Sequence, residues 1–157
     1  MNVDDIKQSC LQVMEQSEVV VVTTRDADGS LFSRSMFNLR CANQFPNLRQ
    51  LFDGHRDDLL VYLSTNTSSK KVEQLRLDPH AALHYGVPRS FLSVMLWGKV
   101  ELTQDEKIRR ALWQEGWEMY FPQGPLDPDY TALVLRPSRL RGWLGKQAFD
   151  THMEQTP

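Results

Sequence analysis

The stretch from Leu59 to Leu75 constrains the fold of this chain more than any other part of it. Its first residues, Leu59–Leu63, are apolar and include a valine and a tyrosine, which is typical of a buried strand. A run of serine, threonine and asparagine follows, and this composition favours a turn. The pattern predicts a strand, a polar turn and then a helix that begins near Thr67 or Ser68.

Two lysines, Lys70 and Lys71, fall in the first turn of this predicted helix. Exposed cations there cost about 0.3–1 kcal/mol each, because the helix dipole makes the N-terminus positive. The arrangement becomes favourable if backbone N–H groups, hydroxyls and one lysine hold an anion at that end. We interpret the stretch as a phosphate-binding site; the alternative is a solvated helix start with lysines pointing away. The hydroxyls available are those of Thr65, Thr67, Ser68 and Ser69.

Length and composition exclude several classes of protein. A chain of 157 residues suits one domain, so we expect a single domain over residues 1–157. The net charge of −2 gives no basic field, so nucleic acid is not an expected partner. Cys10 and Cys41 stand alone and the four histidines show no ligand spacing, so no metal site is predicted. Without a membrane-length apolar run or a signal-peptide core, we expect a cytoplasmic location and no membrane partner.

The residues before the central stretch predict a short helix and a β-hairpin. Apolar residues in Asp4–Gln16 recur at helical spacing, with Asn2 or Asp4 as the cap. Val19–Thr24 is rich in β-branched residues and Ser30–Phe37 alternates, with turn residues between them. The hairpin is therefore predicted to join these two segments.

On the second strand of this hairpin, Phe32, Arg34 and Met36 share one face. If that face points inward, the guanidinium of Arg34 needs an anionic partner, because an unpaired buried charge is costly. The alternative is a solvated face on which Arg34 is simply exposed. The residues that follow, 38–58, form a long polar connection. They are predicted to be an inserted loop that acts as a lid, belongs to a dimer contact or decorates an edge.

The later segments predict three more strands, a helix and a loose tail. A capping box at residues 103–106 predicts a helix from Asp105 to Tyr120. Gly98 interrupts a long strand, which favours a bulge or a close backbone approach. The polar tail, residues 144–157, is predicted to be loose. The three strands are Ala81–Tyr85, Phe91–Leu102 and Thr131–Leu135, the last of which is predicted to be the final strand.

The central stretch resembles a segment of a known family. The run S-T-N-T-S-S-K-K-V-E-Q-L, Ser64–Leu75, is similar to the T-x-x-x-S-x-K segment of the pyridoxamine 5'-phosphate oxidase-like family of FMN-binding split β-barrels. The pattern W-x-x-x-W followed by F-P-x-G-x-x-D-P, Trp113–Pro128, resembles the general stress protein branch. The resemblance implies a mainly β fold with peripheral helices, an antiparallel split β-barrel of the FMN-binding type. It also implies a homodimer with FMN at the interface.

The resemblance further implies which residues bind the flavin. In the family, the serine and lysine matching Ser69 and Lys71 bind the phosphate of FMN. The strand S-R-S-M-F looks like the family's R-P-M strand, whose arginine contacts the phosphate and whose backbone lies along the isoalloxazine ring. The ending L-R-P-S-R-L-R-G-W gives Trp143 the role of approaching the flavin from the partner subunit. The cofactor-binding residues predicted in this way are Arg34, Ser35, Met36, Phe37, Ser64, Thr65, Ser69, Lys70, Lys71 and Trp143.

The function implied is that of an FMN-dependent oxidoreductase, a reductase of a small molecule with NAD(P)H as electron donor. The flavin carries the hydride chemistry, in agreement with the lack of a triad, paired carboxylates or a metal cluster, so no catalytic residue is named. The C-terminal R-x-x-P motif of true pyridoxamine phosphate oxidases has no match, so vitamin B6 oxidation is not expected. Two alternatives stay open: a non-catalytic flavin-binding stress protein, and a barrel that binds another planar cofactor such as haem or a deazaflavin.

Overall fold

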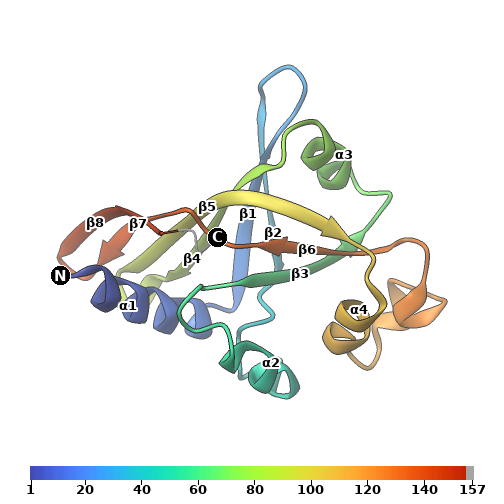
Figure 1. Cartoon of the computed structure of the whole chain (residues 1–157), viewed down its shortest axis with the longest axis horizontal. Coiled ribbons are helices and arrows are strands. Elements are labelled where there is room, and N and C mark those ends of the chain that lie inside the picture. Colours follow the sequence, from blue (N-terminus) through green and yellow to red (C-terminus); the bar gives the residue numbers. More distant parts are fainter. Residues whose placement is uncertain (155–157) are drawn as a thin grey trace.

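A computed structural model, which describes residues 1–154, consists of a curled antiparallel sheet with helices along its margins (Figure 1). This is the mainly β, split-barrel architecture that the family resemblance implies. The strands are β1 (Val19–Arg25), β2 (Leu31–Phe37), β3 (Val61–Asn66), β4 (His80–Val87), β5 (Leu92–Thr103), β6 (Tyr130–Leu135), β7 (Arg139–Leu144) and β8 (Gln147–His152). The helices are α1 (Val3–Gln16), α2 (Arg49–Asp53), α3 (Lys70–Leu77) and α4 (Glu106–Leu112), with 3₁₀ turns η1 (Pro46–Leu48), η2 (Pro88–Ser90), η3 (Trp117–Met119) and η4 (Gly124–Leu126).

The order of the strands leaves the barrel open at one place. The main path runs β2-β1-β4-β5-β6-β3, so that β2 and β3 lie at its two ends. The long strand β5 pairs with β6 through its second half and with β7 through its first half, and β8 extends β7. The ends of the path meet, because β2 contacts β3, but no strand pairing joins them. The sheet is therefore split between β2 and β3.

The inner face of the curl packs against α1 and forms the main core. Strand β1 shows the burial pattern of a sheet with one covered face: Val20 and Val22 are buried, whereas the alternate residues Val19 and Val21 are not. This period of two is what a sheet with one covered face requires. Helix α1 is capped by Asn2, one of the two predicted caps, whose side chain accepts a hydrogen bond from the N–H of Asp5 in a capping box. The helix buries Ile6, Cys10, Leu11, Val13 and Met14.

The opposite side of the sheet, which we call the outer face, carries no helix layer over β1, β4 and β5 (Figure 1). One row across it is given by the register: Ser35 lies opposite Val21, Val21 opposite His84, His84 opposite Met95 and Met95 opposite Arg141. Residues opposite one another share a face. Large apolar side chains that are exposed on this face include Val19, Phe37, Trp97 and Trp143.

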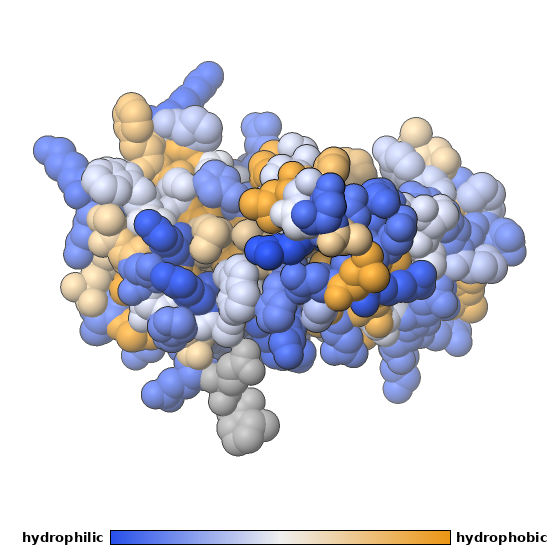
Figure 2. Space-filling view, turned by 90° about the horizontal axis from the view of Figure 1, so that it is seen from above, coloured by the Kyte–Doolittle hydropathy of each residue, from blue (hydrophilic) through white to orange (hydrophobic). Residues whose placement is uncertain are grey.

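Other apolar side chains are exposed on the margin of the molecule that carries α3 and the tip of the β1–β2 hairpin. Figure 2 shows apolar groups standing among predominantly polar residues on the face seen from above. Leu31, Phe32 and Leu77 are exposed at 66%, 46% and 61%. The hairpin tip projects beyond the body of the sheet (Figure 1), which leaves Leu31 and Phe32 of β2 without a covering layer.

Residues 38–58 are packed against the body of the protein. They contain η1 and α2, and their apolar side chains join a second core with α4 and β6. The buried guanidinium of Arg40 holds the segment in place, donating to the carbonyl oxygens of Leu60 at 2.8 and 3.0 Å and of His55 at 2.7 Å. It also lies over the ring of Phe52 at 4.6 Å. The predicted inserted loop is thus an ordered part of the protein and not an unpacked connection.

Two predicted helix boundaries were wrong for identifiable reasons. Helix α3 begins at Lys70 with Ser69 as its N-cap, later than predicted, because Ser68 donates both its N–H and its hydroxyl to Asp129. Helix α4 is capped by Asp105 and ends at Leu112, far short of the predicted Tyr120. The chain turns at Gly116, where φ is +88°, and Trp117 is buried in an aromatic cluster. Tertiary packing of the tryptophans therefore overrides the helical pattern.

The prediction that residues 144–157 are loose and that the sheet ends at Leu135 was also wrong. Strands β7 and β8 follow β6 and form a hairpin through the two-residue turn at Gly145 and Lys146. Phe149 and Met153 of this segment are buried in the main core. The rest of the prediction, residues 155–157, lies outside the described residues. In the part that the structure describes, no helix is long and apolar enough to cross a membrane.

Glycine 142 allows β7 to pack closely on β5, and its substitution tests this contact. A Cβ at Gly142 would collide with the carbonyl oxygen of Ser93 and lie 2.9 Å from the Cα of Val94. Because both obstacles are backbone atoms, Gly142→Ala is expected to destabilise the protein by about 1–3 kcal/mol. Chemical denaturation followed by circular dichroism measures this change.

Gly54→Ala is the matched control for this substitution. Gly54 has φ −74°, and a Cβ there would meet nothing within 4 Å. The control is expected to be as stable as the parent or more stable by up to about 1 kcal/mol. Equal midpoints for Gly142→Ala and the parent protein would show that β7 can move away from β5 at no cost.

Candidate functional site

The split between β2 and β3 holds a hollow of about 310 Å³, which we call the split pocket. Both strands end the sheet, so their facing backbone N–H and C=O groups have no ladder partner and are free to bind a ligand. Helix α3 closes one end of the pocket and the η3 segment lines another side. The lining residues are Val19, Ser35, Met36, Phe37, Ser64, Thr65, Asn66, Lys71, Trp117, Tyr120 and Phe121.

Lys71 supplies positive charge to the split pocket. Its Nζ donates to the hydroxyl of Thr65 at 2.9 Å, so the first turn of α3 is tied to β3. Burial lowers the pKa of Lys71, and the nearby Arg34 lowers it further. Among residues 1–154, no carboxylate lies within 4 Å of Nζ of Lys71. A partly desolvated ammonium therefore has only a neutral partner.

Arg34 is a second cation of the same kind beside the pocket. Its Nη1 donates to the hydroxyl of Thr24 at 2.7 Å and to the carbonyls of Phe32 and Val22, and its Nη2 donates to Oε1 of Gln74 at 3.1 Å. All four acceptors are neutral, and burial lowers the pKa of the guanidinium. The predicted inward orientation of Arg34 is thus observed, but without the anionic partner that a buried guanidinium requires.

The groups around these two cations match the oxygen atoms of a phosphate. The hydroxyls of Thr65 and Ser69 lie 3.5 Å apart, and the Ser69 side chain makes no capping bond to α3. Nε2 of Gln74 is a buried donor without a partner among the described residues. A phosphate carries up to two negative charges and accepts several hydrogen bonds, which is the complement of two cations and free donors. The residues present therefore fit a phosphate group.

Lys70, which the sequence predicted to bind the cofactor, points away from the split pocket. Its Nζ lies 3.3 Å from a carboxylate oxygen of Glu73 and 3.8 Å from one of Asp26. The two neighbouring lysines differ because consecutive residues of a helix face different directions. Lys71 is on the sheet side of α3, whereas Lys70 is exposed on its outer side. We leave Lys70 out of the proposed site.

An aromatic wall of Phe37, Trp117 and Tyr120 completes the split pocket; of these residues, the sequence analysis assigned only Phe37 to the cofactor site. Phe37 of β2 stacks on Trp117 with ring centroids 6.3 Å apart and an angle of 15°, and Tyr120 meets the edge of Phe37 at 6.3 Å. Phe37 and Tyr120 are exposed at 47% and 43%. The W-x-x-x-W pattern was the available signal, but it was interpreted as helix and core. This wall provides the flat apolar surface that a planar ligand needs.

Trp143, the remaining predicted residue, lies far from the split pocket within one chain. It belongs to β7, whereas Phe37 belongs to β2, and the path between them crosses β1, β4 and β5. The path along the curled sheet from one to the other covers four strand spacings, roughly 19 Å. Trp143 lines a separate hollow of about 610 Å³ on the outer face, which we call the outer-face hollow. One chain alone does not bring Trp143 to the cations.

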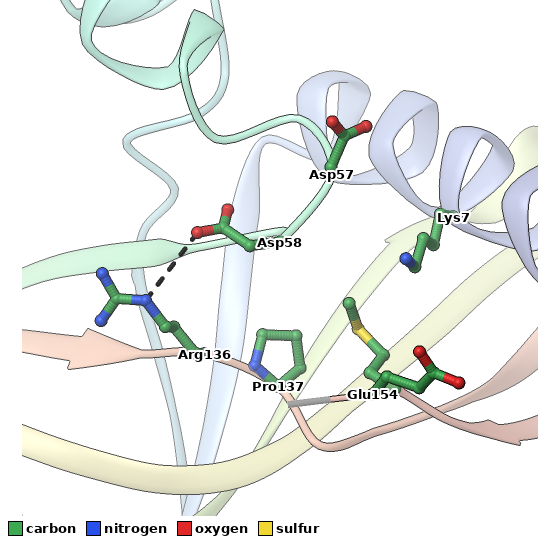
Figure 3. A pocket seen from close by; sticks show the side chains of 7 residues that line it. Lys7, Asp57, Asp58, Arg136, Pro137 and Glu154 are labelled. Carbon is green, nitrogen blue, oxygen red and sulfur yellow. Dashed lines mark ion pairs between the residues drawn. The ribbon is translucent and has the colours of Figure 1, made fainter. Parts of the chain in front are cut away.

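A third hollow, of about 290 Å³, lies between α1 and the turns before β3 and β7 (Figure 3). Lys7 and Arg136 reach into it, together with the carboxylates of Asp57, Asp58 and Glu154. Nε of Arg136 is 3.8 Å from Asp58. Its charges are mixed, unlike those of the split pocket. Within residues 1–154, no group of three or more histidine, cysteine or acidic side chains could hold a metal ion.

Comparison with known proteins agrees with this architecture. The family model described as pyridoxamine 5'-phosphate oxidase matches residues 6–144. A Clostridium acetobutylicum protein related to general stress protein 26 of B. subtilis has a similar structure, with a TM-score of 0.72, 24% sequence identity and 97% of each chain covered. None of the curated proteins matches the chain.

Two further solved structures with this fold differ in what their names say they bind. A pyridoxamine 5'-phosphate oxidase-related, FMN binding protein from Nostoc punctiforme has a TM-score of 0.61 and 13% identity, covering 98% of this chain and 96% of that one. A heme binding protein from Mycobacterium smegmatis has a TM-score of 0.65 and 15% identity, covering 93% of this chain and 57% of that one. At these identities the likeness concerns the fold.

The family model matches most of the chain, and the antiparallel sheet is split as in the solved structures of this fold. Both observations lead to the family that the motif around Lys71 predicted. The chain belongs to the pyridoxamine 5'-phosphate oxidase family and has the split-barrel fold of its general stress protein relatives.

Proposed function

We propose that the chain binds FMN in the split pocket and acts as an FMN-dependent reductase of a small molecule. The observation that carries this proposal is the pair of partly buried cations, Arg34 and Lys71, whose hydrogen-bond acceptors are all neutral. A phosphate group supplies the negative charge that such a pair lacks. The FMN binding named for the Nostoc punctiforme relative supports the choice of a flavin.

In this proposal, one group of residues binds the phosphate of FMN and another lies beside its ring system. Lys71, Arg34 and the hydroxyls of Thr65 and Ser69 hold the phosphate. Ser64 and the β2 segment Ser35–Phe37 line the pocket beside the ring system. The aromatic wall of Trp117 and Tyr120 then excludes water from one side of it. These residues bind and orient the cofactor, and bound FMN supplies the hydride transfer.

The proposed electron donor is NAD(P)H. No residue of the split pocket is a histidine or a carboxylic acid, so we name no acid or base. A non-catalytic flavin-binding stress protein is the second candidate, because the same pocket would store FMN without a substrate site. Turnover separates these two candidates, whereas flavin binding does not.

Haem is a further candidate, since one relative with this fold is named a heme binding protein. Haem proteins hold iron through histidine, cysteine, methionine or tyrosine. Of the described residues that line the split pocket, Met36 and Tyr120 are of these types, and no histidine or cysteine is present. The unneutralised cations favour a phosphate-bearing cofactor, so we place FMN first.

We further propose that a second copy of the chain completes the site. At its β2 end the outer face carries Ser35 and Phe37, which line the split pocket, and at its β7 end it carries Trp143. A two-fold contact through this face sets the β2 end of one copy against the β7 end of the other. The exposed apolar side chains Val19, Phe37, Trp97 and Trp143 suit burial in such a contact. Trp143 of one copy would then meet the cofactor held by the other.

Lys71→Ala tests the phosphate site. Purified protein is expected to retain the visible absorption of oxidised flavin after FMN is added and the sample is desalted. Because a charge-assisted hydrogen bond is lost, Lys71→Ala should weaken FMN binding by about 1.5–3 kcal/mol. Fluorescence titration measures this, and riboflavin, which has no phosphate, should bind the parent and the variant equally.

Lys70→Ala is the matched control, since Lys70 contacts Glu73 and Asp26 instead of the split pocket. Its FMN affinity should stay close to that of the parent. The phosphate assignment is wrong if Lys70→Ala and Lys71→Ala bind FMN equally well. It is also wrong if Lys71→Ala weakens riboflavin as much as FMN, because the loss would then not involve the phosphate.

Subunit mixing tests whether the site is shared. Lys71→Ala and Trp143→Ala should each bind FMN weakly as pure proteins. When the two are unfolded and refolded together, heterodimers contain one site with both residues intact, so about one site in four should regain the parent affinity. Light scattering checks that the mixture is dimeric. If the mixture is dimeric and no site regains the parent affinity, the shared site is wrong. Either Lys71 and Trp143 of the same chain then form one site, or Trp143 has no part in it.

Turnover tests the reductase proposal. FMN-loaded protein is expected to oxidise NADPH, with a panel of small acceptors, faster than an equal concentration of free FMN. The Lys71→Ala protein at the same total FMN serves as the control for unbound flavin. A rate no higher than that of free FMN, with flavin firmly bound, would identify a flavin-binding protein without turnover.

A further inference from the structure

The outer face carries a group of polar side chains next to Trp143. Nε2 of His84 and the hydroxyl of Ser93 are hydrogen-bonded at 2.7 Å. Ser93 lies directly opposite Trp143 in the pairing of β5 with β7. Arg141 is two residues before Trp143 on the same strand and therefore on the same face. Ser93, Arg141 and Trp143 all line the outer-face hollow.

Arg141 has a guanidinium without an ion pair among the described residues, although Asp150 also lines the outer-face hollow and its pKa is lowered by Arg139 and, to a smaller extent, by Arg141. The acid opposite it in the register is Asp150 of β8. Both oxygens of Asp150 are taken by Arg139, with Nε to Oδ1 at 2.7 Å and Nη2 to Oδ2 at 2.6 Å. Among residues 1–154, Arg141 takes part in no ion pair within 4 Å. The planar donor array of Arg141 is therefore available to a carboxylate or phosphate.

The positions of these groups define what would fit between them. His84 and Arg141 flank Met95 on its two sides, so their backbones are roughly 10 Å apart. Side chains of this length can approach one anionic group from both directions. The indole of Trp143, 47% exposed, offers an apolar surface beside that point. A volume of about 610 Å³ is in the range of small-molecule sites.

We infer that the outer-face hollow binds the substrate, and that the substrate is a planar molecule bearing a carboxylate or a phosphate. Its ring lies on the indole of Trp143, and its anionic group lies between Arg141 and the His84–Ser93 pair. This inference rests on the proposed function, because the second copy sets the hollow of one chain over the cofactor of the other. The residues act in binding and specificity, and no bond is made or broken by them.

Nicotinate and nicotinamide are matched probes for this site. Both are planar pyridines of nearly equal size, and only nicotinate carries a negative charge. The indole N–H signal of Trp143 in a proton–nitrogen NMR spectrum, assigned by its loss in Trp143→Phe, reports binding to the full chain with and without FMN. Nicotinate should shift this signal saturably and bind at least about tenfold more tightly than nicotinamide, a charge-assisted contact being worth 1.5–3 kcal/mol.

Arg141→Gln should remove most of this preference, and Arg89→Gln is its control. Arg89 lies in the exposed turn between β4 and β5, outside the hollow. With Arg141→Gln the affinity for nicotinate should fall about tenfold, to that of nicotinamide, while Arg89→Gln should leave it unchanged. An equal loss in both variants would mean that nicotinate responds to general surface charge, and the inference would be wrong.

Flavin absorption of the same samples separates this inference from the proposed function. Retained FMN with no difference between nicotinate and nicotinamide would overturn the anion site and leave the flavin proposal standing. A selective, Arg141-dependent effect of nicotinate in a protein that takes up no FMN would support the anion site as such. It would also overturn the shared flavin site.

Discussion

The missing ladder between β2 and β3 is the feature on which the site depends. Seven strand pairings close the rest of the sheet, and each uses the backbone donors and acceptors of the strands involved. At the split, two strand edges face each other with unpaired backbone N–H and C=O groups. Proteins normally cover such edges with other parts of the chain or pair them with a partner. Here the tie between Lys71 and Thr65 and the wall of Phe37 and Trp117 hold the edges apart as a lined pocket. The proposed ligand site is this lined opening between the two strands.

Electrostatics explains why the occupant should be an anion. Burial lowers the pKa of Arg34 and that of Lys71, and the charge of the nearby Arg34 lowers the pKa of Lys71 further. The neutral acceptors around them satisfy geometry but do not neutralise charge. A bound phosphate would remove the repulsion and stabilise the folded protein in proportion to its concentration. The electrostatic free energy of Arg34 and Lys71 is thus less favourable without a bound phosphate than with one. This is expected of a binding site and not of a structural ion pair.

The sequence predicted the parts of this structure that local patterns control. The β-branched run of β1, the alternation in β2 and the helical spacing of apolar residues in α1 are patterns of nearby residues, so the hairpin and α1 were identified correctly. Helix α4 was overextended because burial of Trp117 is a tertiary effect that the helical pattern does not contain. Strand β8 was missed because its sequence is largely polar and its partner β7 alone makes it a strand. For the site, the cation-rich start of α3 was visible and the family motif pointed to Lys71, but only the fold shows that Lys70 contacts Glu73 and Asp26 instead of the split pocket.

The position of Trp143 has a consequence for how the family motif can work in this chain. Strands held by continuous hydrogen-bonded ladders cannot shift by four strand spacings, so no local rearrangement brings Trp143 to Lys71 of the same chain. Either the tryptophan has no part in the flavin site, or it acts on the site of another copy. Its exposure on an uncovered sheet face, among other apolar side chains, favours the second case. In that case the outer face would be both the contact between copies and the surface that each copy presents to the other's cofactor, so assembly and ligand selection would depend on the same residues.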